Sequence, residues 1–95
     1  MVAYNITRQR GTFGEHLRAW RMVQGLTAQQ VCERAEISLT TLRNLERGDG
    51  GVRLEAVLQV ARALGVLDSL VESVDPLRTD LGRARADLIH RKRVR

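Results

Sequence analysis

Apolar residues recur at helical spacing in successive segments of the chain. The first segment opens with a capping box at Thr12 and keeps apolar residues three and four positions apart until Gly25. The second segment, Thr27 to Ala35, begins with the same kind of cap. The third, Ser38 to Arg47, follows directly, begins with a strong N-cap candidate and is followed by a glycine, where helices commonly end. The pattern therefore predicts three helices, of which the second and third are short and closely linked.

The next stretch carries the most continuous apolar stripe, which Gly65 closes. The members of this stripe are Leu54, Val57, Leu58, Ala61 and Leu64. A shorter fifth helix is predicted from Val66 to Val74, because the residue before Pro76 is disfavoured in a helix.

These elements predict an all-α fold, a five-helix bundle formed by residues 12–75, with an N-terminal arm (1–11) and a C-terminal tail (76–95). A chain of 95 residues has room for one compact core. Its single Phe, Trp and Tyr leave Leu, Val, Ala and Ile to build that core, which suits packed helices. In the N-terminal arm, apolar residues alternate from Val2 to Ile6, so a strand and a mobile end both stay open.

The net charge of +5 is concentrated at the C-terminal end. Residues 1–76 hold nine basic and nine acidic residues, whereas residues 77–95 hold seven basic and two acidic ones. Clustered basic residues are a usual sign of a nucleic-acid partner. The tail can bind DNA phosphates, bind a partner protein or remain a disordered solvated end, and the sequence leaves these three open. Its basic residues are Arg78, Arg83, Arg85, Arg91, Lys92, Arg93 and Arg95.

Several function classes lack support in the sequence. No apolar run is long enough to span a bilayer and the first residues lack a secretory signal, so we expect a soluble, cytoplasmic protein. The glycine-rich stretch from Gly48 to Gly51 follows no predicted strand and forms no nucleotide-binding loop. His16 and His90 stand apart from any nucleophile or carboxylate cluster, and Cys32 is expected to be a small buried apolar residue. We therefore expect no enzyme activity, no metal and no cofactor.

The second and third predicted helices together have the form of a helix-turn-helix. The spacing around them resembles the lambda-repressor-like, or Xre-type, DNA-binding domains over roughly Thr12 to Leu70. The matching segments are Leu17-Arg18-Ala19-Trp20-Arg21, Gly25-Leu26-Thr27, Val31, Ala35, Ile37-Ser38, Leu42, Leu45-Glu46-Arg47-Gly48 and Leu54 to Gly65. The resemblance implies double-stranded DNA as the ligand, with the second helix crossing the phosphate backbone and the third entering the major groove.

The resemblance assigns base contacts to the third helix. The residues at the corresponding positions are Leu39, Thr40, Thr41, Arg43 and Asn44. An asparagine can pair with both hydrogen-bonding groups on the adenine edge, while Leu39 and the Thr40 methyl can pack on a thymine methyl. Arg43 is placed to reach either guanine or a phosphate. The unpaired N–H groups at the start of this helix also favour a phosphate or an electronegative base edge.

The resemblance also implies which residues contact the DNA backbone and which have a structural role inside the protein. The resemblance implies backbone contacts for residues that flank the groove, namely Thr27, Gln29, Ser38 and Arg47. Arg21 and Glu46 match the family's internal ion pair, which is structural. Two positions depart from the family: Ala28 replaces a glutamine that bridges phosphate and the third helix, and Glu36 replaces a glycine in the turn. A left-handed backbone at Glu36 is expected to cost about 1 to 2 kcal/mol.

The tail adds a second resemblance. An Asp-Pro-Leu segment (75–77) followed by a basic end is similar to small Xre-type regulators encoded beside HipA-like toxin kinases. This similarity implies a HipB-like antitoxin, which represses its own operon and also neutralises a toxin kinase through its tail or outer surface.

We expect a homodimer on a palindromic operator, because one helix-turn-helix contacts one half-site and two half-sites lie about 34 Å apart. The apolar surplus from Val66 to Val74 with Leu77 is one candidate interface, and crossed N-terminal strands from Val2 to Ile6 are the other. Trp20 belongs either to the core or to a dimer contact. The sequence thus predicts a nucleoid-associated repressor of its own operon, controlled through a partner protein.

Overall fold

The computed structural model describes residues 5–91, with side chains through residue 89. This part of the chain is all-α, as predicted, and contains no strand. No helix within it is long and apolar enough to cross a membrane. Its elements are α1 (Ile6–Val23), α2 (Ala28–Ala35), α3 (Leu39–Arg47), α4 (Leu54–Ala63), α5 (Leu67–Glu72), the 3₁₀ turn η1 (Pro76–Arg78), α6 (Asp80–Ala84) and α7 (Ala86–Arg91).

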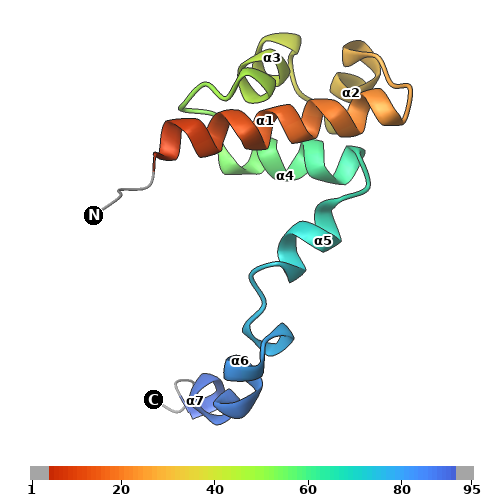
Figure 1. Cartoon of the computed structure of the whole chain (residues 1–95). Helices are drawn as coiled ribbons and strands as arrows, with labels where there is room; N and C mark the ends of the chain where they lie inside the picture. Colours follow the sequence, from red (N-terminus) through yellow and green to blue (C-terminus); the bar gives the residue numbers. More distant parts are fainter. Residues whose placement is uncertain (1–4, 92–95) are drawn as a thin grey trace.

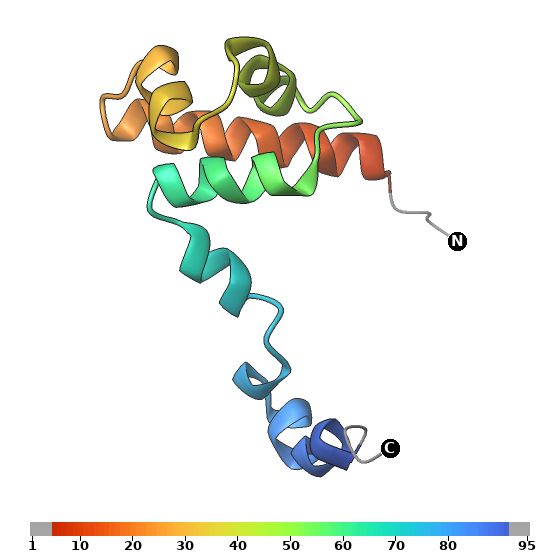
Figure 2. The same cartoon turned by 180° about the vertical axis from the view of Figure 1, so that it is seen from behind.

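Helices α1 to α4 form a bundle, and the chain from α5 onward leaves it. α3 packs against α1, α2 packs against α4, and α2 and α3 contact each other. In Figure 1, α2 and α3 lie above α1 and α4. Figure 2 shows the same arrangement from behind, with residues 67–91, here called the arm, projecting on the side opposite α2 and α3. The radius of gyration is 16.5 Å, whereas about 12 Å is expected for a compact chain of this length. The arm accounts for the difference.

The core lies inside the four-helix bundle. Leu42 from α3 is 1% exposed, and Val31 from α2 and Val60 from α4 are fully buried. Burial raises the pKa of the Cys32 thiol, so this side chain stays protonated at neutral pH and packs as a small apolar group. The buried apolar residues are Leu17, Val31, Cys32, Ala35, Leu42, Leu45, Val60, Ala61 and Leu64.

α1 begins at Ile6 rather than at Thr12, so the predicted start is wrong. The N-cap is Asn5, whose side-chain oxygen accepts a hydrogen bond from the backbone N–H of Arg8 at 3.1 Å. Ile6 is therefore helical and does not belong to an N-terminal strand. The rest of that possible strand, Val2 to Tyr4, lies outside the described residues.

α1 and α3 approach each other through their backbones at two glycines. A Cβ atom on Gly14 would lie 2.7 Å from the carbonyl oxygen of Glu46. A Cβ atom on Gly48, where φ is +78°, would lie 2.7 Å from the backbone nitrogen of Gly11. Arg10 Nε donates a hydrogen bond to the carbonyl oxygen of Gly48 at 2.8 Å. Only glycine allows this spacing, which fixes α3 against α1.

The turn between α2 and α3 has a left-handed backbone at Glu36, the position where the resembling family carries glycine. Glu36 has φ 60° and ψ 45°, and within the described range no other non-glycine residue has a positive φ. Its N–H and that of Ile37 both donate to the carbonyl oxygen of Cys32. The turn therefore keeps the geometry that glycine favours, at a cost of about 1 to 2 kcal/mol.

The arm is organised by local hydrogen bonds. α5 packs against α4 and ends at Glu72, earlier than the predicted Val74. The Asp75 side chain accepts a hydrogen bond from the N–H of Leu77 at 2.9 Å and caps η1. Thr79 caps α6 in the same way. Several apolar side chains of the arm are exposed, namely Val71, Val74, Leu77, Leu81 and Ile89.

Candidate nucleic-acid interface

α3 starts with a side-chain cap that leaves its first amide groups free. The Oγ of Ser38 accepts a hydrogen bond from the N–H of Thr41 at 3.1 Å, and the Ser38 hydroxyl donates to Thr41 Oγ1 at 2.9 Å. The N–H groups of Leu39 and Thr40 have no acceptor within the helix. Because the helix dipole adds positive potential here, this end of α3 favours a phosphate or an electronegative base edge.

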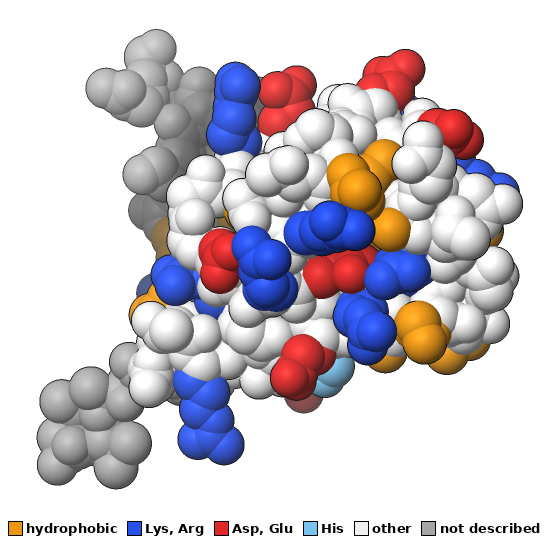
Figure 3. All heavy atoms as spheres, turned by 90° about the horizontal axis from the view of Figure 1, so that it is seen from above, with side chains coloured by type: hydrophobic (Ala, Val, Ile, Leu, Met, Phe, Trp, Pro, Cys, Tyr) orange, Lys and Arg blue, Asp and Glu red, His pale blue; other side chains and the backbone are white. Residues whose placement is uncertain are grey.

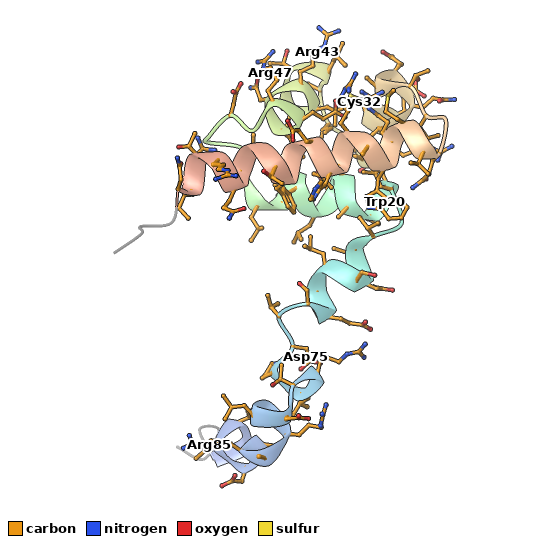
Figure 4. All side chains as sticks on the ribbon, viewed as in Figure 1. Trp20, Cys32, Arg43, Arg47, Asp75 and Arg85 are labelled. Carbon is orange, nitrogen blue, oxygen red and sulfur yellow. The ribbon has the colours of Figure 1, made fainter. Side chains whose placement is uncertain are left out.

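The outer face of α3 presents Thr40, Arg43 and Arg47, which are exposed and lie about one turn apart. Figure 4 shows Arg43 and Arg47 on the side of the bundle away from the arm. Asn44, beside them, is partly buried. Leu39 packs in part against the core, so only a portion of its side chain is available to a thymine methyl.

A polar groove of about 310 Å³ lies between α3 and the start of α4. Ser38, Thr41 and Asn44 line it from α3, and Arg53 and Gln59 line it from the α4 side. These side chains offer hydrogen-bond donors and acceptors. Glu55 and the apolar Ile37 and Val52 also line the groove, so it suits a hydrogen-bonding base edge better than a phosphate.

A second groove, of about 320 Å³, lies on the other flank of α3, against α1 and the start of α2. Arg18, Arg43 and Arg47 line it next to Ala28, and we call it the arginine groove. Figure 3 looks onto this side of the molecule and shows basic side chains gathered there, with acidic ones among them. Arg18 was not among the site residues predicted from the sequence. The available signal was its position three residues before Arg21, on the same face of α1.

Arg21 and Glu46 join α1 to α3 through an ion pair with two hydrogen bonds. Arg21 Nε lies 2.8 Å from Oε2, and Nη2 lies 3.0 Å from Oε1. Arg21 Nη1 also donates to the carbonyl oxygen of Leu26 at 3.3 Å. The hydrogen bond to Glu46 raises the pKa of Arg21, while burial opposes this shift. The two side chains are 13% and 10% exposed and also line the arginine groove, so the pair is partly buried and ties α3 to α1.

A smaller network lies at the end of α3. Arg47 Nη2 donates to Oδ1 of Asn44 at 2.8 Å and to Oδ2 of Asp49 at 3.0 Å. Arg47 and Asn44 were predicted to have separate roles, and no role was predicted for Asp49. The available signal was an acidic residue directly after the glycine that ends the helix.

The start of α2 has a complete capping box. Thr27 Oγ1 accepts a hydrogen bond from the N–H of Gln30 at 3.0 Å, and Gln30 Oε1 accepts one from the N–H of Thr27 at 2.9 Å. Thr27 and Gln29 are exposed, and Ala28 between them lines the arginine groove. The start of α2 therefore lies beside the outer face of α3.

The basic residues of the tail lie apart from this surface. Arg78 pairs with Glu72 at 3.4 Å and Arg83 pairs with Asp80, both at exposed positions. Arg85 lies at the far end of the arm (Figure 4). The structure does not bring these residues to α3. The side chains of Arg91, Lys92 and Arg93 are outside the part of the chain that the structure describes.

The donors and cations of this surface are concentrated around α2 and α3. Among the described residues, no group of three or more His, Cys, Asp or Glu is placed to hold a metal ion. A family model for a helix-turn-helix domain matches residues 12–74, which include all of α2, α3 and α4. No curated protein shows a match. Members of such families bind DNA and are typically not catalysts. The chain therefore belongs to the helix-turn-helix domain family, whose function is DNA binding in the regulation of transcription.

Proposed function

We propose that the protein is a sequence-specific, lambda-repressor-like (Xre-type) regulator that inserts α3 into the major groove of double-stranded DNA. The observation that carries the proposal is the exposed row of Thr40, Arg43 and Arg47 at a helix whose first amide groups are free. A groove lined by arginines runs along one flank of this helix and a polar groove along the other. A protruding helix of this kind fits the width of the major groove.

In this proposal the bases are contacted from the first two turns of α3. Asn44 pairs with an adenine, and Thr40 with the exposed part of Leu39 packs on a thymine methyl. Arg43 contacts guanine or a neighbouring phosphate, and Thr41 lines the polar groove beside them. Each good base contact contributes about 1 to 3 kcal/mol of discrimination.

In this proposal the flanking residues contact phosphates and fix the position of the protein along the DNA. Arg18 and Arg43 form no ion pair and no side-chain hydrogen bond in the described part of the chain, so their charge is available to a phosphate. Thr27 and Gln29 support this role because they are exposed at the start of α2. Ser38, which caps α3, is exposed on the same surface. Such contacts add affinity but carry no sequence information.

We further propose that two copies bind a palindromic operator and repress the operon that encodes the protein. The exposed apolar residues Val71 and Val74, at 55% and 80% exposure, support an interface at the end of α5. Trp20, which is 47% exposed, lies near the junction of α4 and α5 (Figure 4) and is a further candidate contact. A dimer seated on a promoter excludes polymerase, so repression is the expected sign. In this role the protein acts in the cytoplasm, on the nucleoid.

The experiment is binding of the full chain to the duplex directly upstream of its own gene, with unrelated DNA as competitor. We expect a complex that resists the competitor and that Asn44→Ala abolishes. Arg43→Ala is expected to weaken binding about tenfold, whereas Arg62→Ala, at an exposed arginine of α4, serves as the matched control. Binding that unrelated DNA displaces equally well contradicts the proposal.

The arm supports a second function, that of a HipB-like antitoxin that binds a HipA-like kinase. The arm carries exposed apolar residues and projects on the side opposite α3 (Figure 1), so a protein bound there leaves the proposed DNA surface free. Val74→Asp and Leu81→Asp, at 80% and 71% exposure, are expected to abolish neutralisation of a co-expressed kinase while DNA binding persists. Ile6→Asp, at an exposed position of α1, is the control. Neutralisation that survives both arm substitutions contradicts this function.

A further inference from the structure

Arg47 at the end of α3 is held by two neighbouring side chains. Its Nη2 donates to Oδ1 of Asn44 at 2.8 Å and to Oδ2 of Asp49 at 3.0 Å. Its Nε lies 3.4 Å from the same Asp49 oxygen. Both side chains of the ion pair are largely exposed, at 63% and 48%, so the carboxylate links the arginine and the asparagine in a hydrogen-bonded bridge on the surface of α3.

The backbone after α3 fixes where this carboxylate lies. The N–H of Gly48 donates to the carbonyl oxygen of Leu45 at 3.0 Å, and the N–H of Asp49 donates to that of Asn44 at 2.9 Å. With Gly48 in the left-handed conformation, these two bonds form a Schellman motif. Because the motif ties the Asp49 backbone to the last turn of α3, its carboxylate stays within reach of Arg47.

The three arginines named for the arginine groove differ in whether a carboxylate pairs with them. Arg47 is paired with Asp49, whereas Arg18 and Arg43 have no such partner in the described part of the chain. An unpaired arginine attracts any phosphate, because phosphate contacts do not depend on base sequence. Pairing Arg47 lowers its contribution to binding of unrelated DNA.

Arg47 also sets the orientation of the Asn44 amide. Because Oδ1 accepts a hydrogen bond from Arg47, the amide oxygen lies toward Arg47 and the NH₂ group points the other way. Oδ1 keeps a second lone pair. Asn44 is thus prepared for one orientation of a two-bond pair with adenine, in which Oδ1 accepts from N6 and Nδ2 donates to N7.

We propose that Asp49 is a positioning residue for sequence discrimination: it keeps Arg47 from binding phosphates freely and, through Arg47, holds Asn44 in one amide orientation. The inference rests on the proposed function, since it concerns the same surface of α3. It assigns a role in DNA recognition to an acidic residue, which by its charge alone only opposes binding to DNA.

The test compares two duplexes of about 30 base pairs, long enough for two half-sites. One is the sequence that the unsubstituted protein enriches from a random pool, and the other is a scrambled version of it. In Asp49→Asn, the ratio of the two affinities is expected to fall about tenfold. Binding to the scrambled duplex is expected to tighten, with a salt dependence steeper by about 0.9 in log–log slope, the value for one added phosphate contact.

Three further variants separate positioning from a general charge effect. Asp49→Glu keeps a carboxylate and is expected to retain the original slope. Asp68→Asn removes the same charge from an exposed position of α5 and is expected to leave the affinity ratio unchanged. In the double variant Asp49→Asn with Arg47→Ala, the added slope is expected to disappear, because the freed arginine is gone.

The outcomes distinguish this inference from the proposed function. If the unsubstituted protein enriches no sequence, the proposed function and the inference both fail. If it discriminates and Asp49→Asn keeps the same ratio and slope, only the inference is overturned. An Asp68→Asn variant that behaves like Asp49→Asn also overturns it, because net charge alone then explains the effect.

Discussion

The bundle of α1 to α4 and the arm from α5 to α7 are both helical, but different interactions hold them. In the bundle, leucine and valine side chains are completely enclosed, and the Arg21–Glu46 pair is nearly so. In the arm, caps such as those of Asp75 and Thr79 define short helices, while apolar side chains remain exposed and ion pairs are open to solvent. A buried core holds the bundle, whereas local caps hold the arm and leave much of its apolar surface exposed.

The comparison also separates two kinds of charge. The bundle, residues 5–66, holds nine basic and six acidic residues, and Arg18, Arg43 and Arg47 line its arginine groove. The described part of the arm holds four basic and five acidic residues, and Arg85 lies at its far end (Figure 4). The positions of individual arginines in the bundle are therefore more informative than the net charge of the chain.

The largest expected difference between the two regions is in apolar packing. Leu42→Ala, at a side chain that is 1% exposed, is expected to lower the free energy of unfolding by about 3 to 4 kcal/mol through lost burial and the resulting cavity. Leu81→Ala in the arm, at 71% exposure, is expected to change it little. Urea unfolding of both variants measures the contrast, and equal losses would show that the arm is part of the cooperative core.

A smaller contrast is expected between ion pairs. Glu46→Ala leaves the Arg21 guanidinium enclosed without its carboxylate and is expected to cost about 2 to 3 kcal/mol, somewhat less than for a fully dry pair. Glu72→Ala removes the exposed partner of Arg78 and is expected to have almost no effect on stability. Thermal unfolding at low and high salt checks this. A salt-sensitive loss at Glu46 would contradict the enclosed character of that pair.

The smallest effect, with the opposite sign, is expected at the turn. Glu36→Gly relieves the left-handed strain and is expected to stabilise the domain by about 0.5 to 1 kcal/mol after the entropic cost of glycine. Glu33→Gly, within α2, is the control and is expected to destabilise by about 1 kcal/mol. Calorimetry of the two variants gives the signs directly, and a destabilising Glu36→Gly would show that the glutamate side chain is needed in the turn.

Much of the bundle follows from local signals in the sequence. The caps at Thr27 and Ser38 mark the starts of α2 and α3, because a hydroxyl at that position satisfies an otherwise free amide. The resemblance also implied a pair between Arg21 and Glu46, which the structure brings together across α1 and α3. These features depend on a few neighbouring residues or on spacing that a family shares.

Other features depend on tertiary contacts that spacing does not show. α1 continues through Gly11 and Gly14, which weaken a helix locally but allow its backbone to meet α3. The link from Asp49 to Arg47 requires the left-handed turn at Gly48, so it cannot be inferred from residue types alone. The direction of the arm likewise depends on how α5 leaves α4.

The backbone contact between α1 and α3 has a consequence for how such a domain can change its target. Glycines and carbonyl groups on the inner side of α3 position it against α1, so its outward side chains contribute little to this packing. Under the proposed function, substitutions at Thr40, Arg43 or Asn44 would alter the preferred DNA sequence while the helix keeps its place. A duplicated gene of this kind would then acquire a new DNA target without a change of fold.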